Sequence, residues 1–230
     1  MEKLMYLLWK PDGAGQAWPQ AMHQLASALC QQGACRLRLC LDDADVAPAA
    51  AMRLSSPGIP LPDAIIAFWM DSASQRAPYE ALLQEVCRQL AGYTVAESEP
   101  LPNTLHPASG GARTHGMNHV VFLQVPPRLT REEWLSLWHD GHTAVAIETQ
   151  QTFGYRQNVV VRRLTADAPP VDAIVEENFP PAAMTEQDAF YRRSTAEELA
   201  TNQKRMYQSC KRFIDFDKMG RLPTSEYNYN

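Results

Sequence analysis

The chain has 230 residues, of which 45% are hydrophobic and 20% are charged, and its formal net charge is -5. These values are ordinary for a globular protein and allow one sizeable domain or two of roughly 110 residues each. Because the acidic chain has no basic run and no basic–aromatic stripe, we expect no nucleic-acid partner.

Hydrophobic periodicity predicts two successive sets of elements, each in the order βαββαβ. The first set comprises strands 3–9, 35–41, 63–70 and 93–99, with helices 18–31 and 78–91. The second comprises strands 117–125, 152–164, 172–177 and 222–227, a helix at 130–147, and one or two helices between 185 and 213. The proline-rich stretch 42–62 lacks an apolar period, so we expect a long loop there, by default a disordered excursion.

Short matches between the two sets indicate an internal duplication. Residues 63–66, Asp-Ala-Ile-Ile, match residues 172–175, Asp-Ala-Ile-Val, and each segment follows a proline-containing loop. A segment rich in proline, glycine and small polar residues separates the sets, which is typical of a linker. We therefore expect a degenerate ferredoxin-like repeat at 1–104, a linker at 105–116 and a second ferredoxin-like repeat at 117–230.

The expected fold class follows from this order of elements. A βαββαβ unit forms a four-stranded antiparallel sheet with both helices on one face, and its other face needs a partner. Two such units in one chain can cover each other. We therefore predict an α+β fold in which two ferredoxin-like repeats form an intrachain α+β barrel.

The predicted helix at 130–147 carries the main candidate for chemistry. Thr130 and Glu133 have the spacing of a capping box, which fixes the start of the helix and its phase. Trp134, Trp138 and His142 then recur every fourth residue and share one inward-facing stripe. Both tryptophans are most simply core residues, and Trp138 can also form the wall of an aromatic pocket.

The same phase predicts that His139 and Asp140 point to solvent, so His139 and His142 would not share a metal ion. Gly141 lies beside His142, where we expect it to leave space or to permit close backbone approach. His142 itself has two interpretations. It is either an acid or base in an apolar pocket, or a buried neutral histidine bonded to a backbone carbonyl.

The following strands carry further candidates. Tyr155 can orient or protonate a substrate oxygen and Asn158 can bind one, but alternation places them on opposite faces, so one of them is expected to be structural. Glu176 and Asn178 share a face, and Glu176 is expected to line the barrel interior near His142. A solvated strand end is the alternative.

Other site classes have weaker signals. His115 and His119 precede or begin a strand without helical register, and no phosphate loop, serine elbow or Cys–His signature occurs. The five cysteines form no Cys-x-x-Cys pair and are expected to be reduced. We expect no metal and no cofactor. The short apolar run at 4–9 and the lack of any apolar segment of ~20 residues predict a cytoplasmic protein without a membrane partner.

Residues 129–158 resemble the EthD domain, a family of the dimeric α+β barrel superfamily. The resemblance rests on an aromatic residue, a tryptophan and a histidine at four-residue spacing, followed by an aromatic residue and an asparagine. Here these are Trp134, Trp138, His142, Tyr155 and Asn158. The first half lacks counterparts of Trp138 and His142, so one site per chain is expected.

The resemblance implies a cofactor-free enzyme, a lyase, isomerase/cyclase or oxygenase, acting on a small hydrophobic, aromatic or polyketide-derived molecule. His142, Tyr155 and Glu176 are the expected catalytic residues, and Trp134, Trp138, Asn158 and Asn178 the expected substrate-binding residues. A non-catalytic ligand-binding or scaffold protein is the alternative. A haem-binding barrel is a third option, because histidine-ligated relatives exist in the superfamily, and a homodimer also remains open.

Overall fold

The computed structural model describes residues 1–15, 17–193 and 195–229. The elements of the first half are β1 (Glu2–Trp9), α1 (Ala17–Gln31), β2 (Cys35–Leu41), β3 (Ala64–Met70), α2 (Ala77–Val86) and β4 (Gln89–Leu101). Those of the second half are β6 (Met117–Leu123), α3 (Arg131–Leu135), α4 (Thr143–Thr149), β7 (Gly154–Arg163), β8 (Ala173–Phe179), α5 (Gln187–Phe190), α6 (Ala196–Cys210) and β9 (Gly220–Asn228). A two-residue strand, β5 (Ala112–Arg113), lies between the halves.

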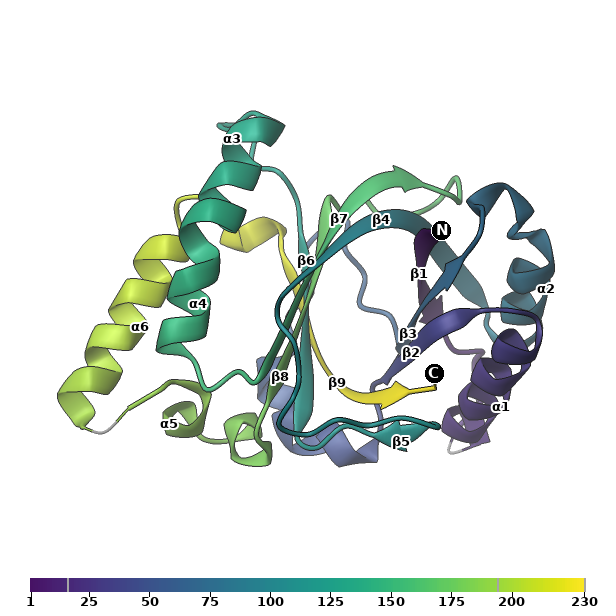
Figure 1. Ribbon diagram of the computed structural model, residues 1–230, viewed down its shortest axis with the longest axis horizontal. Helices are drawn as coiled ribbons and strands as arrows, with labels where there is room; N and C mark the ends of the chain where they lie inside the picture. Colours follow the sequence, from purple (N-terminus) through teal and green to yellow (C-terminus); the bar gives the residue numbers. More distant parts are fainter. Residues whose placement is uncertain (16, 194, 230) are drawn as a thin grey trace.

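The strands form one antiparallel sheet that closes on itself. Its order is β2-β3-β1-β4-β7-β8-β6-β9-β5, and β2 also pairs with β9. The two halves therefore meet at two seams, β4 with β7 and β2 with β9. Helices α1 and α2 lie on one side of this barrel and α3, α4 and α6 on the other (Figure 1). The fold is thus a mixed α/β arrangement around a large antiparallel sheet, an α+β barrel-like fold.

The predicted boundary between the second helix and the fourth strand is wrong. Helix α2 ends at Val86, whereas β4 already begins at Gln89, inside the range predicted as helical. Residues 89–92 pair with β1, and Gly92 lies flat against the ring of Tyr6, where a Cβ atom would be 2.6 Å from the ring. Pairing with β1 therefore overrides the local helical pattern.

Both segments expected to be irregular contain ordered structure. The 42–62 loop contains a 3-10 helix (Ala44–Met52), whose Val46 and Ala49 are buried against Met117 and Phe179. The disordered excursion taken as the default is therefore wrong, because the apolar residues of this helix cover one end of the barrel. Within the predicted linker, β5 pairs with the end of β9.

The barrel interior is divided into an apolar part and a charged part. The apolar part contains side chains from both halves, including Met5, Ile65, Tyr93, Phe122 and Ile174. The charged part contains lysine, arginine and glutamate side chains joined by ion pairs. Lys3, Arg156, Glu176 and Glu226 are buried, and Arg38 and Glu97 are partly buried. The interior of the barrel is therefore filled by side chains of the chain itself.

The two outer faces of the sheet differ. Under α1 and α2, the rings of Tyr6, Phe68 and Tyr79 stack in series, with centroids 6.0 and 5.4 Å apart, and fill the space. Under α3, α4 and α6 the packing leaves a cavity.

Among the helices that the structure describes, none combines the length and the apolar character that a membrane-spanning helix requires.

Candidate active site

The helix that carries His142 is not a regular α-helix. Thr130 and Glu133 form the predicted capping box in full, and α3 begins at Arg131. From Ser136 to His142, however, the chain is a π-helix, and α-helical geometry resumes with α4. The wider π turn, with its i→i+5 hydrogen bonds, suits side chains four residues apart that share one face. Trp134, Trp138 and His142 are all buried.

The π turn changes the positions of two neighbours. His139 is half-buried, with its ring edge-on to Trp138 at 4.6 Å between centroids, whereas Asp140 is exposed. The prediction that His139 points to solvent is therefore wrong, because the π segment does not follow the 100° step of an α-helix. A Cβ atom at Gly141 would approach nothing closer than 3.6 Å, so close packing does not explain this glycine.

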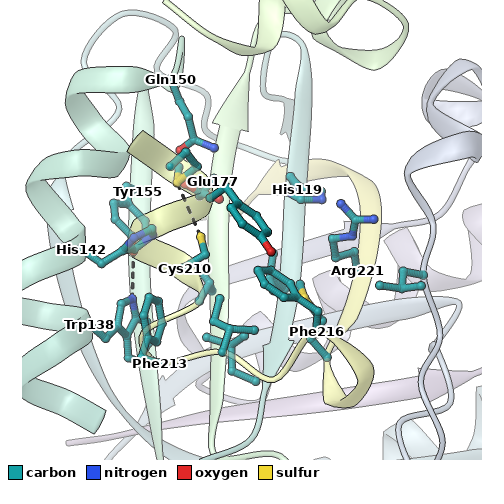
Figure 2. Close-up of a pocket in the computed structure, with 18 of the residues that line it drawn as sticks. His119, Trp138, His142, Gln150, Tyr155, Glu177, Cys210, Phe213, Phe216 and Arg221 are labelled. Atoms are coloured by element: carbon teal, nitrogen blue, oxygen red, sulfur yellow. Dashed lines mark hydrogen bonds between the residues drawn. The ribbon is translucent and has the colours of Figure 1, made fainter. Parts of the chain in front are cut away.

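A cavity of about 360 Å³ lies between these helices and the outer face of the second half of the sheet (Figure 2). Its wall is mainly apolar and includes Val121, Leu123, Trp138, Val175, Phe190, Met206 and Phe213. A largely apolar cleft with a few convergent polar groups is the usual form of a small-molecule site. The volume suits a compact organic molecule.

A row of polar side chains crosses the floor of the cavity, one from each of four adjacent strands. Tyr155 of β7 is paired in register with Glu177 of β8, and Glu177 is paired with His119 of β6. On β9, Arg221 is paired with Val121, so it lies diagonally across from His119. All four residues line the cavity. Directly opposed side chains of neighbouring strands have Cβ atoms about 4.5–5.5 Å apart.

Glu177 is the least expected member of this row. Its side chain is buried and makes no hydrogen bond or ion pair within the part of the chain that the structure describes. Desolvation by burial raises the pKa of its carboxyl group to about 8. Glu177 is therefore mostly protonated at pH 7, and in that neutral form it can donate a hydrogen bond.

Two histidines border the cavity in their neutral form. His142 Nδ1 lies 2.9 Å from Ser209 Oγ, its ring packs on Phe213, and burial lowers its pKa to about 4. His119 has no hydrogen-bond partner at either ring nitrogen among the described residues. Burial, and secondarily the charge of Arg221, lowers the pKa of His119 to about 3.

Tyr155 is oriented by two donors. Its hydroxyl oxygen accepts hydrogen bonds from Trp138 Nε1 at 3.0 Å and from Gln157 Nε2 at 3.2 Å. The proton of the hydroxyl is therefore available to a ligand, and desolvation raises the pKa of the phenol well above its usual value. Trp134 lies behind this layer, where its Nε1 donates to the carbonyl of Phe213, and it does not line the cavity.

The expectation that Trp134 binds substrate is therefore not met by a position on the cavity wall, and three further sequence-predicted site residues also lie outside the cavity. Glu176 and Asn158 point into the barrel, where Asn158 Nδ2 donates to Glu176 at 3.0 Å and Lys3 Nζ donates to Asn158 at 2.6 Å. The expectation that Glu176 lies near His142 is wrong, because alternation along β8 turns Glu177 toward His142 instead. Asn178 is buried against Gly154, away from the cavity, with both amide atoms unbonded among the described residues.

Glu176 also differs electrostatically from Glu177. Desolvation alone would raise the pKa of Glu176, but Arg38, Lys3 and Arg156 outweigh it and lower the pKa to about 2. Glu176 is thus a permanent anion in the interior of the barrel, and its neighbour is a neutral acid in the cavity. Sequence reasoning missed Glu177, His119 and Arg221 as site residues.

We expect Glu177→Gln to stabilise the folded protein at neutral pH. The raised pKa means that Glu177 must take up a proton on folding at pH 7, whereas in the unfolded chain it is ionised. This cost is absent below pH ~4 and grows as the pH rises toward the folded-state pKa of about 8. The substitution should raise the free energy of unfolding at pH 7 by about 1–3 kcal/mol. Urea unfolding at pH 4 and pH 7 measures it, and a gain that is equal at both values would contradict the assigned protonation state.

In the described parts of the chain, no three His, Cys, Asp or Glu side chains are grouped so as to hold a metal ion. His115 packs on His106, with ring centroids 4.5 Å apart, and His119 lies at the floor of the cavity.

Comparison with known proteins identifies the fold. No family model matches the sequence, and no curated protein matches it. Among solved structures, an anthrone oxidase-like protein aligns with 100% of this chain and 91% of its own, with a TM-score of 0.53 and 9% sequence identity. A protein of Fusobacterium nucleatum provisionally named a monooxygenase aligns over 99% of this chain and 91% of its own, with a TM-score of 0.50 and 10% identity. At such low identity, the shared property is the α+β barrel-like fold.

Proposed function

We propose that this protein is an enzyme that carries out acid–base chemistry on a small, largely apolar molecule bearing a carbonyl or phenolic oxygen. One observation carries the proposal. A neutral carboxyl group, Glu177, and a neutral imidazole, His142, line the same mainly apolar cavity. Groups whose pKa values are displaced in opposite directions by their surroundings are typical of acid–base pairs in enzymes.

The two groups suit different tasks. In the tautomer that donates Nδ1–H to Ser209, His142 presents an unprotonated Nε2 that can accept a proton from an activated carbon or a phenol. Tyr155 and Glu177 each offer an O–H donor to the oxygen on which negative charge then develops. Proton removal is thereby provided by a residue of the helix, and oxyanion stabilisation by residues of the sheet.

The enolate or phenolate formed in this way is the common first intermediate of several reactions. Return of the proton to another carbon is an isomerisation, and attack of the enolate carbon on a carbonyl carbon of the same molecule, with the electron pair passing to that carbonyl oxygen, is a cyclisation. Loss of a leaving group is a lyase reaction, and attack on dioxygen is an oxygenation. Each can proceed with the side chains described and without a bound cofactor. The names of the structural neighbours, an anthrone oxidase-like protein and a provisional monooxygenase, make oxygenation the first outcome to test.

We further propose that the second half, residues 117–230, is an EthD-like ferredoxin-like repeat and that residues 1–104 are a degenerate copy of the same repeat. Residues 105–116 link the two repeats. Two observations support this. The strands of the two halves lie in the same spatial order. In each half the order is fourth, first, third and second strand, which is β4-β1-β3-β2 in the first half and β9-β6-β8-β7 in the second. In the matched Asp-Ala-Ile segments, Ile65 and Ile174 face the barrel interior, whereas Ile66 and Val175 face the helices. One site per chain is expected, since aromatic rings fill the corresponding space in the first half.

Anthrone, a tricyclic ketone with acidic hydrogens at C10, is a suitable first substrate. We expect the protein to accelerate exchange of these hydrogens with deuterium under anaerobic conditions, measured by mass spectrometry. The kcat/KM for exchange should be constant between pH values of about 4 and about 8, where His142 is neutral and Glu177 is protonated. It should fall at lower pH as His142 gains a proton, and at higher pH as Glu177 loses one.

The Glu177→Gln variant is the control for this profile. It should lose the alkaline limb, because glutamine cannot ionise, and keep the acidic limb. Tight binding of anthrone without exchange or oxygen uptake would favour the ligand-binding alternative. A haem absorption band in the purified protein would contradict the proposal in favour of the haem-binding alternative.

A further inference from the structure

The positively charged side chain of Arg221 lies at the edge of the cavity. Arg221 lines this cavity and also an adjoining groove of about 700 Å³. Phe190 and Tyr191 likewise line both the cavity and the groove. Within the described chain Arg221 forms no ion pair, and its Nε atom is buried without a hydrogen-bond partner. By contrast, the partly buried Arg38 pairs with both Glu97 and Glu176 in the barrel.

His119 adds two unpartnered atoms at the same place. Its side chain is only 4% exposed, and neither ring nitrogen has a hydrogen-bond partner in the described residues. It lies diagonally across from Arg221 on the adjacent strand, and Figure 2 shows the two side chains close together at the same side of the cavity. Buried polar groups are nearly always hydrogen bonded, so these unpartnered groups indicate a ligand position.

The charge balance of the cavity defines the ligand. Arg221 is the only arginine or lysine among the described residues that line it, and the one carboxyl group, Glu177, is protonated at neutral pH. An isolated cation in a mainly apolar cavity favours an anion, above all a carboxylate, which a guanidinium group binds with matching geometry.

We propose that Arg221 and His119 form a subsite for a carboxylate on the substrate, so that the substrate is an aromatic acid. The proposal deepens the proposed function, because it adds a recognition group to the same cavity. Neighbouring strands are about 4.8 Å apart, so His119 lies roughly 10 Å across the sheet from Tyr155. Glu177 lies between them, so the reacting oxygen is on the Tyr155 side and the carboxylate on the His119 and Arg221 side of a molecule of about two or three fused rings.

A matched pair of fluorescent compounds tests the subsite by binding alone. Anthracene-2-carboxylate and anthracene-2-carboxamide have the same shape and differ in charge. We expect the wild type to bind the carboxylate at least tenfold more tightly at pH 7 in fluorescence titration. Arg221→Gln should abolish this preference and leave the dissociation constant of the carboxamide within about twofold. Arg221→Lys, which keeps the charge, should retain part of the preference.

Arg162→Gln is the control, since it removes the same charge from an exposed position on β7 outside the cavity. It should bind both compounds as the wild type does. Equal affinity of the wild type for the two compounds, or an equal loss of both in Arg221→Gln, would overturn the subsite. A preserved carboxylate preference in a protein that fails the exchange assay would overturn the proposed chemistry and support the subsite, and failure to bind either compound would contradict both.

Discussion

Replacing His142 by alanine is expected to lower the turnover of anthrone, or of a better substrate, by about 10²- to 10⁴-fold, the usual contribution of a general acid or base. The imidazole lines the same cavity as Glu177 and Tyr155 and is held by Ser209 through Nδ1. Removing it leaves the oxyanion donors in place but takes away the base. We therefore expect the loss mainly in kcat, with KM changed little.

His139→Ala is the matched control, because His139 is on the same π-helical segment and does not line the cavity. Its turnover should stay within about threefold of the wild type. Circular dichroism and thermal unfolding establish that both variants are folded. Equal turnover of the wild type and His142→Ala would eliminate His142 as the base.

A second large effect is expected on the free energy of unfolding when Glu176, the residue next to Glu177 on β8, is replaced. Glu176→Gln should lower the free energy of unfolding by about 3–5 kcal/mol, because removing one partner of a buried ion pair leaves the other charge uncompensated. Lys3 and Arg38, which lie 3.7 and 3.4 Å from Glu176 in the barrel, would then keep Glu97 as their ion-pair partner among the described residues. Urea unfolding at pH 7 measures the change.

The contribution of Glu176 to the free energy of unfolding depends on pH in the direction set by its lowered pKa. The pKa of Glu176 is lowered to about 2 in the folded protein, so its stabilisation is present above the unfolded-state value of about 4.3 and is lost as the pH falls toward 2. Glu176→Gln and Glu177→Gln should therefore have opposite effects at pH 7, although the residues are adjacent. If Glu176→Gln abolished turnover while leaving stability unchanged, Glu176 would belong to the chemistry and not to the barrel interior.

Local sequence determined those features that depend on short-range interactions. Thr130 and Glu133 fixed the start of the helix, because a capping box is made by residues three positions apart. The strands were recognisable from apolar runs, and the Asp-Ala-Ile segments at 63–66 and 172–175 marked equivalent strands. The four-residue spacing of Trp134, Trp138 and His142 marked a buried face.

Tertiary structure decided which face of each strand borders the cavity. Strands β6 and β8 are buried on both faces, so alternation between apolar and polar residues gave no contrast from which to choose Glu177 over Glu176. Pairing with β1 places residues 89–91, which were predicted as helical, in strand β4. The π-helical segment Ser136–His142, which turns His139 away from solvent, could also not be recognised from the spacing of apolar residues.

The row of Tyr155, Glu177, His119 and Arg221 is the clearest example. These residues come from four strands, and each is only one of several polar side chains in its own segment. They meet because the order β7-β8-β6-β9 and its register place them side by side. Strand order and register are set by long-range burial and backbone hydrogen bonding, which the local pattern of residues does not contain.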